Sequence, residues 1–408
     1  MQQIRYNDRQ ASWPYQEKGI RQSMRRLREE PLDAVGRIAA DIGPRRATSL
    51  AEAQVAAYLD GRLRRAGLRV AADTFLAPVS VGWEGVLLGL LAAIYVPLYY
   101  WFPFPALVLA LWSLAIAGWR AARPVPLLAR LRSSQNVIGT YARSQPPRWR
   151  VVLLAPLDSS PIMGRWICRL TDGWRSLIGR AVACGLLALC TLVGLIDIQR
   201  LWWYFQFVPL VYLVTLALVD IYLMRAPGSP GATCHAGAIA VMLASAEALT
   251  NLQQTELWAV GLGATSSGAG LTNLLVRYPF EQNNTLFISL EGLGSGRLSY
   301  ITRAGLFQEQ AADPLLLRLA AATDAADPVI DIEPRVNGDN PTLVEALQHK
   351  GWRALAIACL DANGTIPYRA SPNDIPDVID PTILDRAVRM VIGLVHQIDA
   401  TSDDDRVD

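Results

Sequence analysis

Residues 150–159 have the sequence RVVLLAPLDS, a short β-rich run that ends on polar groups. Apolar and β-branched residues of this kind predict a strand over residues 150–155. In α/β folds, ligand sites lie beyond the carboxyl ends of the strands. The segment that begins at Pro156 and includes Asp158 is therefore a place to look for a functional site.

Further strands alternate with helices on both sides of this run. The capping box Ser49–Glu52 predicts a helix that ends at Gly67. We expect other helices over 236–249, 268–278 and 381–398, and strands over 68–75, 136–141, 257–262, 285–290 and 354–359. Strands that alternate with helices predict an α/β sandwich around a mixed, mostly parallel sheet.

Two long charge-free stretches interrupt this pattern. Residues 85–119 carry no charge and contain Pro103 and Pro105, which predicts two short membrane helices, 85–101 and 104–119, joined by a turn at 102–105. Both are near the lower length for spanning, so a re-entrant hairpin is the alternative. Residues 181–196 and 201–219 are also charge-free, and the aromatic run 202–204 suits a membrane interface. Four buried helices of a soluble domain are disfavoured because amphipathic periodicity is missing.

The composition agrees with a membrane protein. The chain has 408 residues, of which 52% are hydrophobic and 18% charged, against about a quarter charged in average proteins. The net charge of +2 gives no reason to expect nucleic acid as a partner. The five cysteines have neither metal-ligand nor disulfide-framework spacing, and free thiols suit a reducing compartment. The N-terminus has no apolar stretch behind its charges, so we expect no cleavable signal peptide.

The arginines predict the orientation of the helices. The hairpin tips carry only Arg200, beside Asp197. The opposite ends, which face the rest of the chain, carry Arg120, Arg123, Arg130, Arg132, Arg165, Arg169, Arg175, Arg180 and Arg225. By the positive-inside rule, we expect an integral membrane protein with its soluble domain and both termini in the cytoplasm.

The same reasoning predicts the domain organisation. A discontinuous α/β domain comprises residues 20–80, 126–164 and 226–400, and hairpins at 85–119 and 177–224 are inserted into it. An N-terminal extension covers 1–19, and the acidic tail 401–408 is expected to be disordered. Since both hairpins start and end on one side of the membrane, the three soluble pieces can assemble into one domain.

Several short segments follow one another in an order that is similar to a known family. They are Gly43-Pro44-Arg45, Asn136-Val137-Ile138, residues 151–159 (VVLLAPLDS), 231–237 (GATCHAG), 263–268 (GATSSG), 290–294 (LEGLG), 338–343 (GDNPTL) and 369–374 (RASPND). Together they resemble the family-28 metallopeptidases, whose two-zinc aminopeptidase fold is also found in glutaminyl cyclases and the transferrin-receptor ectodomain. The resemblance implies a three-layer α/β sandwich for nearly all of the soluble part.

The family's chemistry needs two divalent metals bridged by a carboxylate, with a glutamate that takes a proton from the bound water. The resemblance places the metal and catalytic positions of that site on Pro156, Cys234, Thr265, Ser266, Glu291 and Ala370. Pro156 and Ala370 stand at histidine ligands (with Arg369 as the alternative if the register slips by one), and Cys234 stands at the bridging aspartate. Thr265 replaces the general-base glutamate and Ser266 a metal-binding glutamate.

Two acidic residues of the family's pattern remain. Glu291 stands at an aspartate ligand and is chemically competent, although it is one methylene longer. Asp158, which in the family orients a ligand, is retained. The chain has three histidines, and His349 and His396 fit ordinary surface or packing roles. With so few ligands, we expect no zinc or other cofactor.

Other chemistry at the same positions stays open. A helix start would favour a thiolate at Cys234. However, His235 is poorly placed as its base, because adjacent helix residues point in different directions. Alternatively, Cys234 is a small residue that fills the space of a metal, or Cys234, Glu291 and either Asp158 or His235 form a single-metal site. Nothing supports a serine–histidine–aspartate triad.

Two functions follow from these observations. The first is a pseudopeptidase, a binding or scaffolding module that is held at the cytoplasmic membrane face and has the bilayer and another membrane protein or subunit as partners. The second is a membrane-bound hydrolase with a rearranged single-metal or thiol site in the same cleft. In either case we expect the ligand or partner at the membrane surface.

Overall fold

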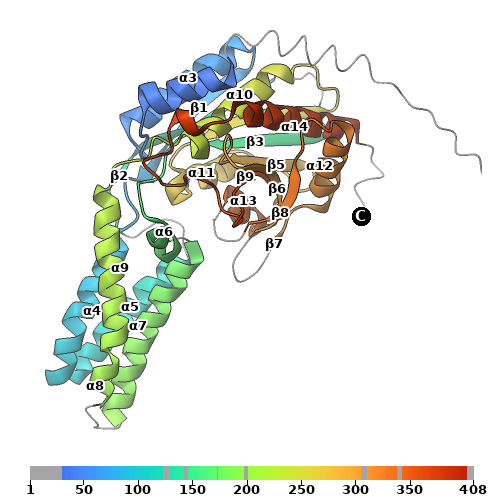
Figure 1. Ribbon diagram of the computed structural model, residues 1–408. Helices are drawn as coiled ribbons and strands as arrows, with labels where there is room; N and C mark the ends of the chain where they lie inside the picture. The colour runs from blue at the N-terminus through green and yellow to red at the C-terminus, as the bar shows by residue number, and fades with distance from the viewer. Residues whose placement is uncertain are drawn as a thin grey trace, which may run out of the picture.

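The structure is a computed structural model that describes residues 30–122, 128–141, 146–171, 173–196, 201–304, 310–337 and 342–401. An α/β part lies at one end, and a bundle of long helices projects from it (Figure 1). The predicted N-terminal extension and all of the acidic tail except Thr401 lie outside the described residues, as do the tip Asp197–Arg200 and residues 338–341.

The α/β part is built on one mixed sheet. Its described strands are β1 (Arg69–Pro78), β2 (Leu131–Thr140), β3 (Trp149–Pro156), β4 (Thr255–Leu262), β5 (Thr285–Glu291), β6 (Arg297–Ala304), β7 (Gln310–Ala311), β8 (Glu333–Val336) and β9 (Arg353–Leu360). The order is β1-β2-β4-β3-β5-β9-β6-β7, and β8 pairs with β6. The central strands β4, β3, β5 and β9 are parallel to one another, while β1, β2 and β6 run antiparallel to their neighbours in this order.

Helices cover both faces of this sheet, which makes the three-layer sandwich that the resemblance implies. One core cluster joins the sheet to α2 (Pro31–Gly36), α3 (Leu50–Arg65), α10 (Gly237–Ala248), α12 (Pro314–Ala326) and α14 (Pro381–Ala400). A second cluster lies under α11 (Ala269–Arg277) and α13 (Leu343–Gln348). Within β3, Leu153 faces the first cluster and Val152 the second, because side chains alternate along a strand.

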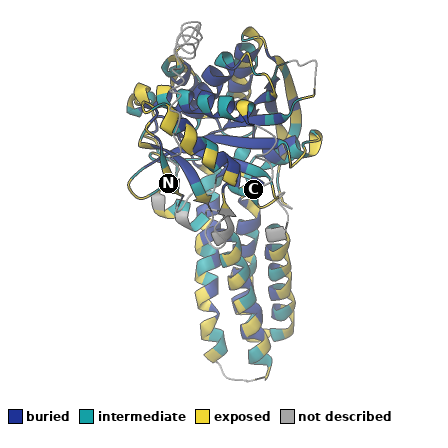
Figure 2. Ribbon diagram, turned by 90° about the vertical axis from the view of Figure 1, so that its right-hand side faces the viewer, coloured by how far each residue is buried: buried dark blue, intermediate teal, exposed yellow. Residues whose placement is uncertain are grey.

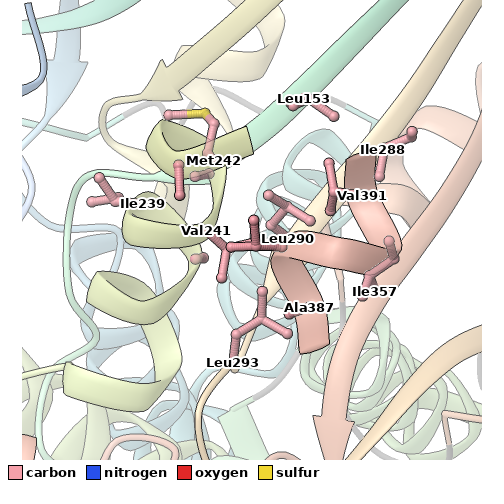
Figure 3. Close-up of a cluster of buried hydrophobic side chains, with 14 of the residues drawn as sticks. Leu153, Ile239, Val241, Met242, Ile288, Leu290, Leu293, Ile357, Ala387 and Val391 are labelled. Atoms are coloured by element: carbon pink, nitrogen blue, oxygen red, sulfur yellow. The ribbon is translucent and has the colours of Figure 1, made fainter. Parts of the chain in front are cut away.

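The first core cluster is uniformly apolar. Figure 3 shows Leu153, Ile288 and Ile357 of three neighbouring strands packed against helices α10 and α14. All seven residues of β5 are buried, which is the burial expected of a strand inside a parallel sheet with helices on both faces.

The boundaries of several elements differ from the sequence prediction. Helix α5 (Pro103–Ala122) begins at Pro103, so the predicted turn 102–105 shrinks to Phe102. Proline is favourable in the first helical turn, where its missing N–H is not needed. The predicted helix 201–219 is split at Gln206 into α8 (Leu201–Phe205) and α9 (Phe207–Arg225). Strands β6, β7 and β8 were not predicted; β7 has two residues and β8 four.

Four described helices are long and apolar enough to cross a membrane: α4 (Trp83–Trp101), α5, α7 (Gly173–Ile196) and the segment of α8 and α9. A helix of 19 residues such as α4 is about 28 Å long, close to the hydrocarbon thickness of a bilayer. Small and apolar side chains pack between the four helices. Large apolar side chains such as Leu90 and Val211 remain exposed. Figure 2 shows exposed residues along the whole length of the bundle.

Each hairpin is inserted where the chain returns next to itself. Pro78 pairs with Leu131 at the ends of β1 and β2, so α4 and α5 extend directly from a two-stranded ribbon. A bridge between Pro161 and Gly228 closes the second insertion, which contains α6 (Arg165–Thr171), α7, α8 and α9. The chain therefore leaves the α/β domain and returns to it at neighbouring points, and neither insertion separates paired strands.

Four charged residues close the bundle at the end that faces the domain. Each lies at the boundary of a charge-free stretch: Glu84 on α4, Arg120 on α5, Arg180 on α7 and Asp220 on α9. Arg120 Nε lies 3.1 Å from Glu84 Oε2, and Arg180 Nη1 lies 2.7 Å from Asp220 Oδ2. A Cβ at Gly85 would lie 1.7 Å from both atoms of the second pair, so only glycine lets the two hairpins approach this closely.

We predict that Arg180→Met lowers the free energy of unfolding by about 3–5 kcal/mol, because it leaves the Asp220 carboxylate buried without its partner. Thermal unfolding of the detergent-solubilised chain measures the effect. The double variant Arg180→Met/Asp220→Leu should recover most of the loss. A double variant as unstable as the single one would contradict an ion pair at this position.

Candidate functional site

The predicted site residues lie around the carboxyl ends of three parallel strands. Strand β3 ends at Pro156, β4 at Leu262 and β5 at Glu291. The turn that contains Thr265 follows β4, and the π-helix Ala232–Ala236 leads into α10. This is the edge at which ligand sites of α/β sheets occur.

The carboxylate of Asp158 is held by the loop that follows β4. Its Oδ1 accepts hydrogen bonds from the backbone N–H of Thr265 at 2.8 Å and from the Thr265 hydroxyl. Its Oδ2 accepts from the N–H of Ser266 at 3.2 Å. Three of the predicted positions therefore do meet. The Asp158 carboxylate accepts hydrogen bonds from Thr265 and Ser266. The Thr265 hydroxyl donates its proton to Asp158 and is not available as a base.

Cys234, which the resemblance predicts at the position of the bridging carboxylate, is buried. Its N–H donates to Asp374 Oδ2 at 3.3 Å, and its Sγ lies 3.8 Å from the carbonyl oxygen of Pro367. Asp374 Oδ1 also accepts from the N–H of Thr233 at 2.6 Å and from its hydroxyl at 2.7 Å. Burial, followed by the charge of Asp374, raises the pKa of the Cys234 thiol well above its ordinary value. The thiol is therefore protonated at neutral pH.

The Glu291 carboxylate has two hydrogen-bond donors, both on one of its oxygens. Its Oε1 accepts from the Ser289 hydroxyl at 2.6 Å and from the N–H of Leu343 at 2.8 Å. Burial raises the pKa of this carboxyl, while these hydrogen bonds oppose the rise. Glu291 comes near Cys234 through the backbone, because the N–H of Gly292 donates to the carbonyl of Cys234 at 3.2 Å.

The remaining ligand positions carry no donor side chain. Pro156 is the buried last residue of β3, and Ala370 is 1% exposed. Ala370 and Tyr368 both have positive φ, at 54° and 56°, which costs about 1 kcal/mol each for residues with a Cβ. The carbonyl of Ala370 accepts from the N–H of Met163 at 2.9 Å. The chain that leads into the second hairpin thus lies against this side of the site.

A buried arginine joins the loops of the site. The guanidinium of Arg45 donates to the carbonyl oxygens of Ile38, Gly43, Leu157, Pro230 and Gly231, at 2.7 to 3.3 Å. Its backbone N–H donates to Ser159 Oγ at 2.9 Å. Burial lowers the pKa of Arg45 to about 10, while Asp374 and Asp158 oppose the shift, so the side chain stays charged at neutral pH.

His235 lies beside this arginine. A Cβ at Gly231 would be 3.0 Å from both His235 Nδ1 and Arg45 Nη2, so both side chains lie against Gly231, which has a φ of 65°. Burial, Arg45 and Arg369 lower the pKa of His235 to about 3, so the imidazole is neutral. Its Nδ1 is buried without a hydrogen-bond partner among the described residues. It forms no hydrogen bond with the Cys234 thiol.

The residues present do not fit a pair of zinc ions. No three His, Cys, Asp or Glu side chains of the described residues group closely enough to hold a metal. Asp158, Cys234, His235 and Glu291 all belong to the described part of the chain. Asp158 is hydrogen-bonded to Thr265, Cys234 to Asp374 and Glu291 to Ser289. Since the four residues form no cluster, the geometry gives no support to a single-metal site either.

Sequence reasoning missed three residues that organise the site. Arg45 and Asp374 were noted only as parts of short resemblances, and Glu52 only as a member of the capping box. Glu52 accepts from the N–H of Ala264 at 2.7 Å and from Ser134 Oγ at 3.1 Å. It lies more than 200 residues from Ala264 in the chain, so no local pattern could have indicated this contact.

Comparisons with known proteins agree with this fold. No protein-family model matches the chain, and no curated protein matches it by sequence. Among solved structures, a zinc aminopeptidase from Bacillus subtilis is 13% identical with a TM-score of 0.55, covering 90% of this chain and 94% of that one. The aminopeptidase from Aneurinibacillus sp. strain AM-1 is 16% identical with a TM-score of 0.54, covering 93% and 95%.

A glutaminyl cyclase from Porphyromonas gingivalis shares the same fold, with 14% identity and a TM-score of 0.52 over 90% of this chain and 97% of that one. The chain therefore has the fold of the zinc aminopeptidases and glutaminyl cyclases. At this level of identity the similarity concerns the fold alone.

We predict that Arg45→Met lowers the free energy of unfolding by more than about 3 kcal/mol, because five buried carbonyl oxygens lose a charged donor. Chemical unfolding in detergent measures the loss. Hydrogen exchange should also rise in residues 157–160 and 228–234. As a control, the exposed Arg69→Met should leave both quantities unchanged. Normal stability of Arg45→Met would contradict this role of Arg45.

We predict a pH dependence that originates at Glu52. Burial and the nearby charge of Asp158 raise its pKa from 4.5 to about 7. The folded chain then holds this proton more tightly than the unfolded chain, so the free energy of unfolding falls as pH rises through this window. Glu52→Gln should flatten the fall between about pH 4.5 and 7 in unfolding measurements, and the exposed control Glu281→Gln should not. If the free energy of unfolding of Glu52→Gln falls with pH as steeply as that of the wild type, Glu52 is not the source of the pH dependence.

Proposed function

We propose that the chain is a membrane-anchored pseudopeptidase, a binding or scaffolding module that keeps the aminopeptidase fold without its zinc chemistry. One observation carries this proposal: polar groups at and beside the predicted metal positions are bonded to the protein's own loops. Asp158 is held by Thr265 and Ser266, and Cys234 lies against Asp374. A metal would have to displace these bonds before it found ligands.

The glutamate that acts as general base in a two-zinc peptidase is also missing. Thr265 stands at the glutamate that would take a proton from water, and a threonine hydroxyl is no base at neutral pH. Glu291 alone keeps a carboxylate at a ligand position. Its hydrogen bonds to Ser289 and Leu343 satisfy one of its oxygens inside the protein.

The alternative, a hydrolase with a thiol or single-metal site, has less support. A nucleophilic cysteine needs a lowered pKa, and the pKa of Cys234 is raised. His235 is neutral and makes no hydrogen bond to the thiol. A single metal would need at least three ligands from a site whose acidic groups already have other partners.

For the membrane we propose two spanning hairpins, with the α/β domain and both termini in the cytoplasm. The apolar length of the four helices supports spanning, and the arginines at their domain-facing ends support the orientation. The hydrogen bond between Met163 and Ala370 joins the site loops to the chain that leads into the second hairpin, which places the site near the membrane surface. Another membrane protein or subunit is therefore the proposed partner.

Zinc content is the deciding measurement, since the chain shares its fold with zinc aminopeptidases. We expect the purified full-length chain to bind zinc only substoichiometrically, with or without added zinc, and to leave aminoacyl substrates unhydrolysed. The matched control is the double variant Cys234→Ala/Glu291→Ala, which should have the same zinc content as the wild type. Stoichiometric zinc that disappears in this variant would overturn the pseudopeptidase and favour the single-metal hydrolase.

A further inference from the structure

The ribbon of β1 and β2 runs from the sheet directly into the membrane helices. Pro78 ends β1 five residues before α4 begins at Trp83. Its partner across the ribbon is Leu131, the first residue of β2. This end of the ribbon must therefore lie close to the level at which α4 and α5 leave the bilayer (Figure 1).

One face of this ribbon end is apolar and exposed. Leu76 is 67% exposed and Leu131 48% exposed. Leu76 pairs with Ser133 and Pro78 with Leu131, so the two leucines lie on the same face of the ribbon, since every second residue of a strand shares a face. Two large exposed leucines at the boundary of four membrane helices suit the zone between lipid headgroups and acyl chains.

The same end of the domain presents exposed arginines. Arg132 lies between Leu131 and Ser133 and therefore projects from the other face of the ribbon, and Arg130 immediately precedes the strand. Arg225, the last residue of α9, is exposed as well. Among the described residues, none forms a hydrogen bond or ion pair with these three guanidinium groups.

Five other charged residues of the described chain at this level have partners. Glu84 binds Arg120, and Asp220 binds Arg180. Arg46 donates to the carbonyl oxygens of Leu223, Met224 and Ala226 at the end of α9. Within the described chain, Arg130, Arg132 and Arg225 therefore remain as unpaired positive charges at the same end of the domain as Leu76 and Leu131.

Exposed aromatic side chains lie at both ends of the helix bundle. Trp83 at the start of α4 is 50% exposed, and Tyr222 near the end of α9 is 48% exposed. Trp101 and Phe102, at the opposite end of α4, are 73% and 60% exposed. Aromatic residues gather at both membrane interfaces, so the two groups delimit the bilayer and place the arginines in its headgroup layer.

We propose that Arg130, Arg132 and Arg225, together with Leu76 and Leu131, form a docking surface for anionic phospholipid headgroups. The leucines enter the acyl boundary, and the guanidinium groups bind headgroup phosphates, for which their geometry is suited. The surface holds the ribbon end, and with it the first insertion, against the membrane. This inference rests on the proposed spanning of the bilayer.

Lipid retention tests the surface on the full-length chain. The protein is purified in a nonionic detergent, exposed to an equal mixture of phosphatidylglycerol and phosphatidylcholine, and the tightly bound lipids are measured by mass spectrometry. The wild type should retain phosphatidylglycerol preferentially. The variant Arg130→Gln/Arg132→Gln/Arg225→Gln should lose about tenfold or more of this preference, because each arginine contributes to the attraction of anionic lipid.

The matched control removes three exposed arginines near the opposite end of the same ribbon, as Arg64→Gln/Arg65→Gln/Arg69→Gln, and should keep the wild-type preference. Equal preference in the wild type and the first variant would overturn the proposal. Resistance of the wild type to alkaline extraction from membranes tests spanning separately. An extracted chain would contradict the anchor itself, whereas a resistant chain without lipid preference would contradict only the docking surface.

A second measurement does not depend on the stability of the arginine variants. A fluorescent label at Leu76→Cys, in a Cys168→Ser background, should be quenched by lipids that carry a quencher near the headgroup. A label at Val329→Cys, an exposed position beside α12, should not be quenched. Equal quenching at both positions would overturn the placement of the ribbon end in the headgroup layer.

Discussion

Two adjacent arginines on one short segment connect the parts of this protein. Arg45 binds carbonyl oxygens from three separate stretches of chain around the site, and its charge is buried. Arg46 binds the last carbonyls of α9, which a helix end leaves without partners. The site loops and the helix bundle are therefore fixed to the same four residues, 43–46. A guanidinium can do this because it offers five donors in a rigid plane.

The sheet accepts two large insertions because each begins and ends at paired backbone. Strands β1 and β2 remain hydrogen-bonded up to Pro78 and Leu131, and Pro161 pairs with Gly228. The parallel centre of the sheet lies away from these points, so its core packing is undisturbed. The two hairpins meet at Gly85. Because glycine has no side chain, the Arg180–Asp220 ion pair packs directly on α4.

Buried acidic groups at the carboxyl edge of the sheet need partners, because an unpaired buried charge is costly. Asp158 and Asp374 obtain theirs from backbone N–H groups and threonine hydroxyls of adjoining loops. The hydrogen bonds of both carboxylates are thus made within the protein. His235 is neutral because burial, and after it the charges of Arg45 and Arg369, lower its pKa.

Local patterns in the sequence predicted most of the fold. The strands of the parallel centre, the capping box at Ser49 and the charge-free helices repeat periodicities or lengths that a short window contains. The resemblance also located Pro156, Cys234 and Ala370 at the site. Only the tertiary structure showed that Asp374 caps the helix of Cys234 and that Arg45 joins the loops. These partners are separated by 140 residues or, for Arg45 and Ser159, by 114, and contacts over such separations depend on how the elements pack.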